Sequence, residues 1–104
     1  MRRAAAALLT AYAAMPLPAI AAGDKALGAY LAGECVTCHQ LSGKAAGSIP
    51  PIAAVPEDQF IALMNSYRKR ERDNQVMQAI AGRLTETEIA ALAAYFAGLP
   101  APQK

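Results

Sequence analysis

The stretch Cys35-Val36-Thr37-Cys38-His39 decides how the rest of the sequence is interpreted. Its C-x-x-C-H order is the pattern of covalent haem attachment. At the end of a helix, residues i and i+3 lie on one side, so both thiols can reach the two vinyl groups along one porphyrin edge. The next residue, His39, then offers its imidazole to the iron. Because these are the only cysteines and the only histidine of the chain, the sequence predicts one covalently bound haem c.

Three other roles for the same residues are open. A disulfide between Cys35 and Cys38 would close a very short loop and stabilise the chain little. A thioredoxin-like dithiol needs a strand-to-helix setting, whereas no stretch of this sequence alternates as a strand does. A structural zinc site takes four ligands, and only three stand together here. Haem is favoured because it also explains how a small exported domain compensates for a thin core.

Apolar residues recur at helical spacing on both sides of the motif and predict an all-α fold, with about four helices around the haem. The expected helices span residues 24–34, 56–68, 74–83 and 85 to about 98. Asp24 is a candidate N-cap, Pro56 suits a first helical position, and Thr85 with Glu88 forms a capping-box pattern. Residues 40–55 carry glycines and prolines without a period, which indicates a loop.

The N-terminal residues predict a secretory signal peptide over residues 1–21, followed by a monohaem domain over residues 22–104. Arg2 and Arg3 form the basic start, an apolar stretch follows, and Ala19-Ile20-Ala21 fits a cleavage site. The apolar run is shorter than the roughly 20 residues that a membrane span requires. We therefore expect a periplasmic protein with no stable membrane anchor after cleavage.

Charge is balanced in the expected mature chain. The 10 lysines and arginines include Arg2 and Arg3, so eight basic residues face eight acidic ones after cleavage. This balance predicts no nucleic-acid surface. Positive charge gathers locally at Arg68, Lys69, Arg70 and Arg72. Arg68 and Arg72 are candidates for contact with haem propionates or with a protein partner, and a solvated helix end is the alternative.

The second axial ligand of the iron has to come from a residue other than histidine. Met64 and Met77 are the methionines left after signal removal. Met64 falls on the apolar stripe of the helix over 56–68, where core packing is the default for methionine. Met77 lies between two helical segments, after a polar run where the chain can fold back over the haem. We expect His39 and Met77 to ligate the iron, with Met77 as a packed core residue being the alternative.

Pro50 and Pro51 follow the motif in the loop. A ligating imidazole usually donates its other N–H group to a carbonyl that fixes the ring. Either proline could supply that carbonyl. The alternative is that both only stiffen the loop.

Taken together, these residues make the chain resemble the class I cytochromes c, and more narrowly the small monohaem cytochrome subunit of flavocytochrome c sulfide dehydrogenase. The similarity runs from Gly28 to Phe96. Its specific parts are the segments 35–39, 50–53, 67–68 with Arg72, 76–77 and 89–96. The family often has glycine where Arg70 stands, and a small residue where Gln40 stands.

The resemblance implies particular roles. Met77 would be the distal ligand, the Pro50 carbonyl would orient His39, and the first and last helices would cross at Gly28 and Tyr95. It also implies electron transfer: the haem would take single electrons from a flavoprotein that oxidises sulfide and pass them to another redox protein.

We identify no catalytic base, nucleophile or substrate pocket in the sequence, so the chain is expected to carry electrons and not to be an enzyme. Two alternatives differ from the flavoprotein-linked subunit. One is a free-standing soluble cytochrome that shuttles electrons between respiratory or photosynthetic complexes. The other is a haem-based sensor, which would need a distal ligand that is easily displaced.

Overall fold

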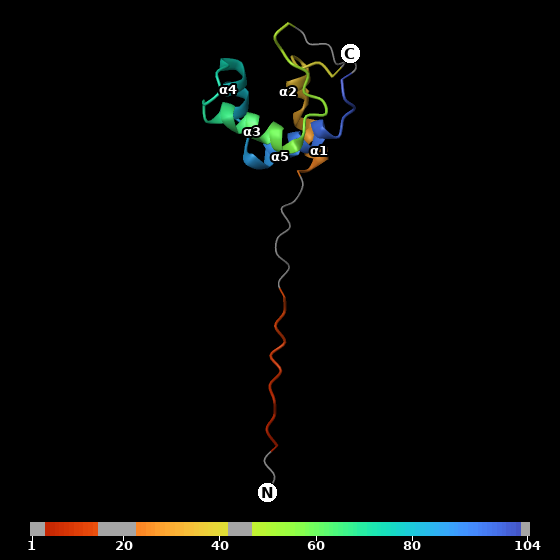
Figure 1. Ribbon diagram of the computed structural model, residues 1–104, viewed down its shortest axis with the longest axis vertical. Helices are drawn as coiled ribbons and strands as arrows, with labels where there is room; N and C mark the ends of the chain where they lie inside the picture. The colour runs from red at the N-terminus through yellow and green to blue at the C-terminus, as the bar shows by residue number, and fades with distance from the viewer. Residues whose placement is uncertain (1–3, 15–22, 42–46, 103–104) are drawn as a thin grey trace.

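The computed structural model of the protein describes residues 4–14, 23–41 and 47–102. The helices in these ranges are α1 (Lys25–Leu31), α2 (Gly33–Val36), α3 (Glu57–Arg68), α4 (Gln75–Gly82) and α5 (Glu86–Ala97) (Figure 1). No strand accompanies them in the described ranges, which confirms the all-α class. The single helix expected over 24–34 is divided at Ala32 into α1 and α2, so α2 carries the start of the Cys35 motif.

The expected signal peptide is only partly covered by the structure. Arg2, Arg3 and the Ala19-Ile20-Ala21 cleavage site lie outside the described residues. Residues 4–14 are exposed and have no regular secondary structure. Within the part of the chain that is described, no helix has the length and apolar character needed to cross a membrane.

Helices α1 and α5 form the closest helix pair of the fold. Gly28 of α1 is buried against α5. A Cβ atom added at Gly28 would collide with the carbonyl oxygen of Ala91 and would lie 2.7 Å from Cβ of Tyr95. Only glycine permits this approach of the two backbones, which confirms the expected crossing at Gly28 and Tyr95.

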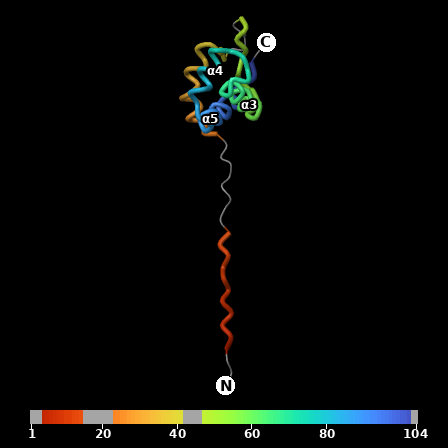
Figure 2. Tube along the Cα trace, turned by 90° about the vertical axis from the view of Figure 1, so that its left-hand side faces the viewer, coloured from red at the N-terminus to blue at the C-terminus, as the bar shows by residue number. Residues whose placement is uncertain are grey.

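The hydrophobic core lies where α3 meets α5. Phe60 and Phe96 stack with ring centroids 5.7 Å apart. Met64 is 5% exposed and lies in the same cluster as Ile89 and Leu92. Helix α3 also packs against α4, so α3 contacts both α4 and α5 (Figure 2). The core thus fixes where α4 stands relative to the rest of the molecule.

Side chains cap the starts of α1 and α5. The Asp24 carboxylate accepts from the backbone N–H groups of Ala26 and Leu27 at the start of α1. Thr85 and Glu88 form both hydrogen bonds of a capping box at the start of α5. Both caps agree with the sequence prediction. Pro56 stands one residue earlier than expected, as the N-cap of α3, because its ψ of 141° is not helical.

The end of α3 is closed by a left-handed residue. Arg70 has φ 59°, and its backbone N–H donates to the Tyr67 carbonyl at 3.0 Å. The N–H of Glu71 donates to the Ser66 carbonyl at 2.9 Å. These two bonds make a Schellman motif, in which glycine is the usual left-handed residue. The turn therefore forms with arginine, and not glycine, at the left-handed position.

Candidate functional site

The Cys35–His39 segment forms one helical turn at the end of α2. The backbone N–H groups of Cys38 and His39 both donate to the Cys35 carbonyl, at 3.2 Å and 2.8 Å. This turn places Cys35 and Cys38 one turn apart on the same side, as the spacing predicts. Both thiols are free; Cys38 is exposed and Cys35 is partly buried.

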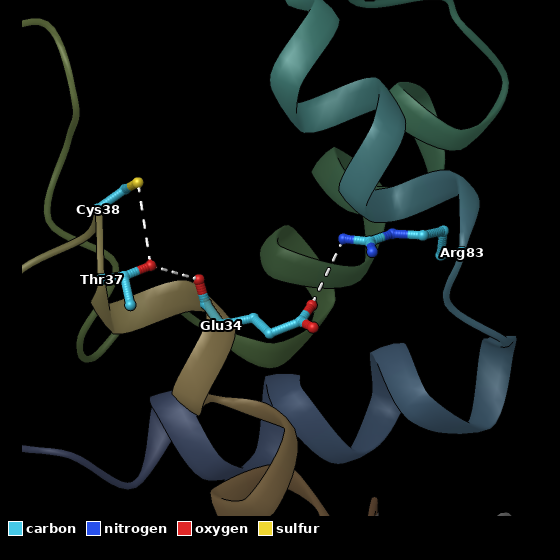
Figure 3. A network of polar contacts seen from close by, with 4 residues as sticks. All are labelled: Glu34, Thr37, Cys38 and Arg83. Atoms are coloured by element: carbon cyan, nitrogen blue, oxygen red, sulfur yellow. Dashed lines mark hydrogen bonds and ion pairs between the residues drawn. The ribbon is translucent and has the colours of Figure 1, made fainter.

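Glu34 precedes the motif and contacts Thr37, at the end of α2, and Arg83, at the end of α4 (Figure 3). Its backbone carbonyl accepts from the Thr37 hydroxyl at 2.9 Å, which satisfies a free carbonyl at the end of α2. Its carboxylate lies 3.5 Å from the Arg83 guanidinium, at the end of α4. The two side chains are 70% and 66% exposed, so this ion pair stabilises the fold little. It does connect the motif with the C-terminal end of α4.

His39 is held by the loop that follows it. Nδ1 of its imidazole lies 2.7 Å from the carbonyl oxygen of Pro50. Because a carbonyl only accepts, Nδ1 is the donor in this contact, and in the neutral ring Nε2 then keeps the lone pair that can bind a metal. Of the two prolines considered from the sequence, it is Pro50 that makes this contact. The resemblance implies the same contact.

The electrostatics of Cys35 bear on the alternatives to haem. Burial, and secondly the Glu34 carboxylate, raise the pKa of the Cys35 thiol above its usual value. Redox-active dithiols depend on a lowered thiol pKa, because the thiolate is the reactive form. The environment of Cys35 therefore disfavours a thioredoxin-like role.

The donor set fits haem c better than it fits zinc or a disulfide. Two free thiols stand one turn apart, and the imidazole beside them has its Nε2 lone pair available. Among the residues that the structure describes, no three His, Cys, Asp or Glu side chains gather closely enough to hold a metal ion. Cys35, Cys38 and His39 are thus suited to hold a porphyrin, with the thiols on its edge and the imidazole on its iron.

The two candidate methionines have different surroundings. Met64 is almost fully buried in the α3–α5 core. Met77 is partly buried and packs against the edge of the core. The structure places it in the first turn of α4, within the helix expected over 74–83 and not between helical segments. Asn74 begins this helix: its side-chain oxygen accepts from the Met77 backbone N–H at 3.0 Å.

Arg68 and Arg72 lie in separate environments. Nε of Arg72 donates to the Tyr67 hydroxyl at 3.0 Å, and its guanidinium carbon is 5.6 Å from the centroid of that ring. Arg68 lines a depression of about 240 Å³ together with Asn65, Lys69 and Glu86. Within the described ranges, no hydrogen bond or ion pair joins either arginine to the Cys35–His39 segment. Among the described residues neither arginine bonds directly to the motif, and their contact with haem propionates or a protein partner stays a prediction.

Sequence reasoning missed three residues around Met77. Asn74 is the N-cap of α4, and an asparagine before an apolar helical run is a signal that could have found it. Tyr67 and Gln78 contact Arg72, at its side chain and at its carbonyl oxygen. No local sequence pattern predicts these two contacts, because they depend on how α3 and α4 pack against each other.

Comparison with known proteins supports this interpretation. The family model described as Cytochrome c matches residues 23–100. A thiosulfate dehydrogenase electron acceptor of Stutzerimonas stutzeri is 34% identical over 70 residues, which is 65% of this chain and 32% of that protein. Another from Thiomonas intermedia is 31% identical over 78 residues, covering 68% of this chain and 36% of that protein. The chain thus spans about a third of the length of these curated relatives.

A solved structure gives the same result for the fold. A thiosulfate dehydrogenase from Marichromatium purpuratum, in its as-isolated form, superposes with a TM-score of 0.69 and is 34% identical in sequence. The match covers 82% of this chain and 21% of that chain. The helical turn of the motif, the His39–Pro50 contact and a family match over three-quarters of the sequence lead to one conclusion: the chain is a class I c-type cytochrome, a member of the cytochrome c family that binds haem c.

Proposed function

We propose that this protein carries single electrons on one haem c, bonded through Cys35 and Cys38 and ligated by His39 and Met77. The observation that carries the proposal is the 2.7 Å contact between His39 Nδ1 and the Pro50 carbonyl. It fixes the imidazole tautomer and leaves Nε2 as a metal ligand. Bound there, haem c supplies a one-electron iron couple. The chain is an electron carrier and not an enzyme.

Met77 is proposed as the distal ligand because its position differs from that of Met64. The Met64 side chain is one of the packed residues of the α3–α5 core, and moving it to a metal would open that core. Met77 stands at the edge of the core, in the first turn of α4. A thioether ligand favours the reduced iron, so we expect a fairly high reduction potential.

The electron donor is proposed to be a redox protein that oxidises an inorganic sulfur compound. Two relatives are named electron acceptors of thiosulfate dehydrogenase, which favours a thiosulfate-oxidising donor. A sulfide-oxidising flavoprotein is the second candidate, on the resemblance to flavocytochrome c sulfide dehydrogenase. The predicted signal peptide indicates export, so we propose a periplasmic location.

Substitution of each methionine tests the ligation. In the oxidised protein, Met77→Leu should abolish the sulfur-to-iron charge-transfer band and lower the reduction potential, because the soft ligand is lost. Met64→Leu is the matched control and should leave both unchanged, since leucine nearly conserves the core volume. If the band disappears in Met64→Leu and survives in Met77→Leu, the assignment is wrong.

Rapid mixing tests the donor. The oxidised cytochrome would be mixed with a purified thiosulfate dehydrogenase and its substrate, and separately with a sulfide-oxidising flavoprotein and sulfide, while haem reduction is followed by absorbance. We expect faster reduction by the thiosulfate enzyme. Equal, slow reduction by both would instead favour a general shuttle. Ready binding of carbon monoxide to the reduced protein would indicate a sensor.

A further inference from the structure

The connection between α3 and α4 is tied by Arg72 at two different points. Its side-chain Nε donates to the Tyr67 hydroxyl, on α3, at 3.0 Å. Its backbone carbonyl accepts from the side-chain amide of Gln78, on α4, at 2.9 Å. One residue of the connection therefore bonds to both helices. We call Tyr67, Arg72 and Gln78 the Arg72 clamp.

The clamp acts on the turn that carries Met77. Gln78 follows Met77 directly, and the backbone N–H groups of both donate to Asn74, to its side chain at 3.0 Å and its carbonyl at 2.9 Å. The Schellman motif at Arg70 fixes the other end of the connection. A backbone movement that carries Met77 away from its position also shifts Gln78, and so stretches the bond from Gln78 to the Arg72 carbonyl.

The bonds of the clamp are near the surface, which limits the contribution of each one. Arg72 is exposed, while Tyr67 and Gln78 are half-buried. The guanidinium of Arg72 lies on the face of the Tyr67 ring, 5.6 Å from its centroid, which adds a cation–π contact to the hydrogen bond. Bonds of this strength do not hold a fold together, but they do set how often a single turn opens.

We propose that Tyr67, Arg72 and Gln78 are positioning residues that hold Met77 on the haem iron and slow its replacement by an external ligand. This inference rests on the proposed ligation by Met77. Opening of the first turn of α4 precedes release of the thioether, and the clamp makes that opening rarer. With haem bound, the clamp would thereby keep the Met77 thioether in place and exclude small molecules that would otherwise take its position.

Imidazole binding to the oxidised protein tests the clamp. Imidazole replaces the methionine, and loss of the sulfur-to-iron band reports the exchange. Gln78→Met removes the amide donor and keeps the side-chain length, and Tyr67→Phe removes the hydroxyl and keeps the ring. We expect each variant to bind imidazole about twofold to fivefold more tightly than the wild type, as the loss of one exposed hydrogen bond implies.

Matched controls separate the clamp from a general effect of the same chemical change. Gln75→Met alters a glutamine of the same helix whose side chain makes no hydrogen bond to a described residue. Tyr30→Phe alters a tyrosine that is 81% exposed on α1. Both controls should bind imidazole as the wild type does. If Gln78→Met and Gln75→Met bind it equally, the clamp is refuted.

Amide hydrogen exchange gives a second measurement that does not depend on imidazole. In Gln78→Met, the backbone amides of Met77 and Gln78 should exchange faster, while those of α5 should keep their protection. Faster exchange throughout α5 would show a structural role and overturn the proposal. A wild-type protein without the sulfur-to-iron band would refute the ligation itself, whereas a normal band with unaltered exchange in the variant refutes only the clamp.

Discussion

Replacing Gly28 by alanine tests how closely α1 and α5 are packed. A Cβ atom at this position meets the Ala91 carbonyl oxygen and lies 2.7 Å from Cβ of Tyr95. The obstacle is the backbone of another helix, which cannot rotate away as a side chain can. Overpacking a tight core costs about 1–3 kcal/mol, and the rigidity of the obstacle places Gly28→Ala near the upper value.

The better helix propensity of alanine offsets part of this cost. Alanine is up to about 1 kcal/mol more favourable than glycine in a helix interior. We therefore expect a net loss of about 2 kcal/mol in the free energy of unfolding. For a domain of this size, each 1 kcal/mol corresponds to about 4–8 °C, so Tm should fall by about 8–16 °C.

Thermal unfolding of the haem-loaded protein, followed by far-ultraviolet circular dichroism, measures the change. Gly33→Ala is the matched control, because a Cβ atom there has no neighbouring atom within 4 Å. That variant should be as stable as the wild type or slightly more stable. If Gly28→Ala unfolds at the same temperature as Gly33→Ala, the close helix crossing is not a constraint and the reasoning fails.

Substitutions at three further positions probe local features by chemical denaturation. Arg70→Gly should raise the free energy of unfolding by about 0.5–1 kcal/mol, because φ of 59° is unfavourable for arginine and free for glycine; no gain would mean that the turn is not strained. Thr85→Ala should lower the free energy of unfolding by about 1 kcal/mol through loss of the capping box. Thr85→Ser keeps the capping hydroxyl and should retain most of that stabilisation. Glu34→Gln should cost less than about 1 kcal/mol, and only at low salt, because its ion pair with Arg83 is exposed; a large, salt-independent loss would contradict this.

The local features of this protein were predictable from the sequence. The caps at Asp24 and Thr85 and the helical turn of Cys35–His39 all involve bonds between residues two to four apart. Such bonds depend on the identity and order of neighbouring residues, which a sequence states directly. One local signal was overlooked: Asn74 caps α4, the helix expected over 74–83, and so places Met77 in its first turn.

Contacts between distant segments could not be derived in the same way. Eleven positions separate His39 from Pro50, and the motif alone does not say which proline carbonyl the loop presents to the imidazole. The position of Arg72 over Tyr67 likewise depends on the left-handed turn at Arg70, which a non-glycine residue does not announce. Arg68 and Arg72 were grouped by sequence proximity, whereas in the structure Arg68 lines a depression with Glu86 of α5 and Arg72 contacts Tyr67.

The sequence by itself determined the chemistry: two thiols and an imidazole in fixed order at a helix end, within an amphipathic helical chain. The tertiary structure alone decided which proline carbonyl contacts His39 and that Arg72 joins α3 to α4. The physical reason is the sequence separation between the residues in contact. Covalent order sets contacts within a helical turn, whereas the remaining contacts exist only once α1 and α3 are packed on α5.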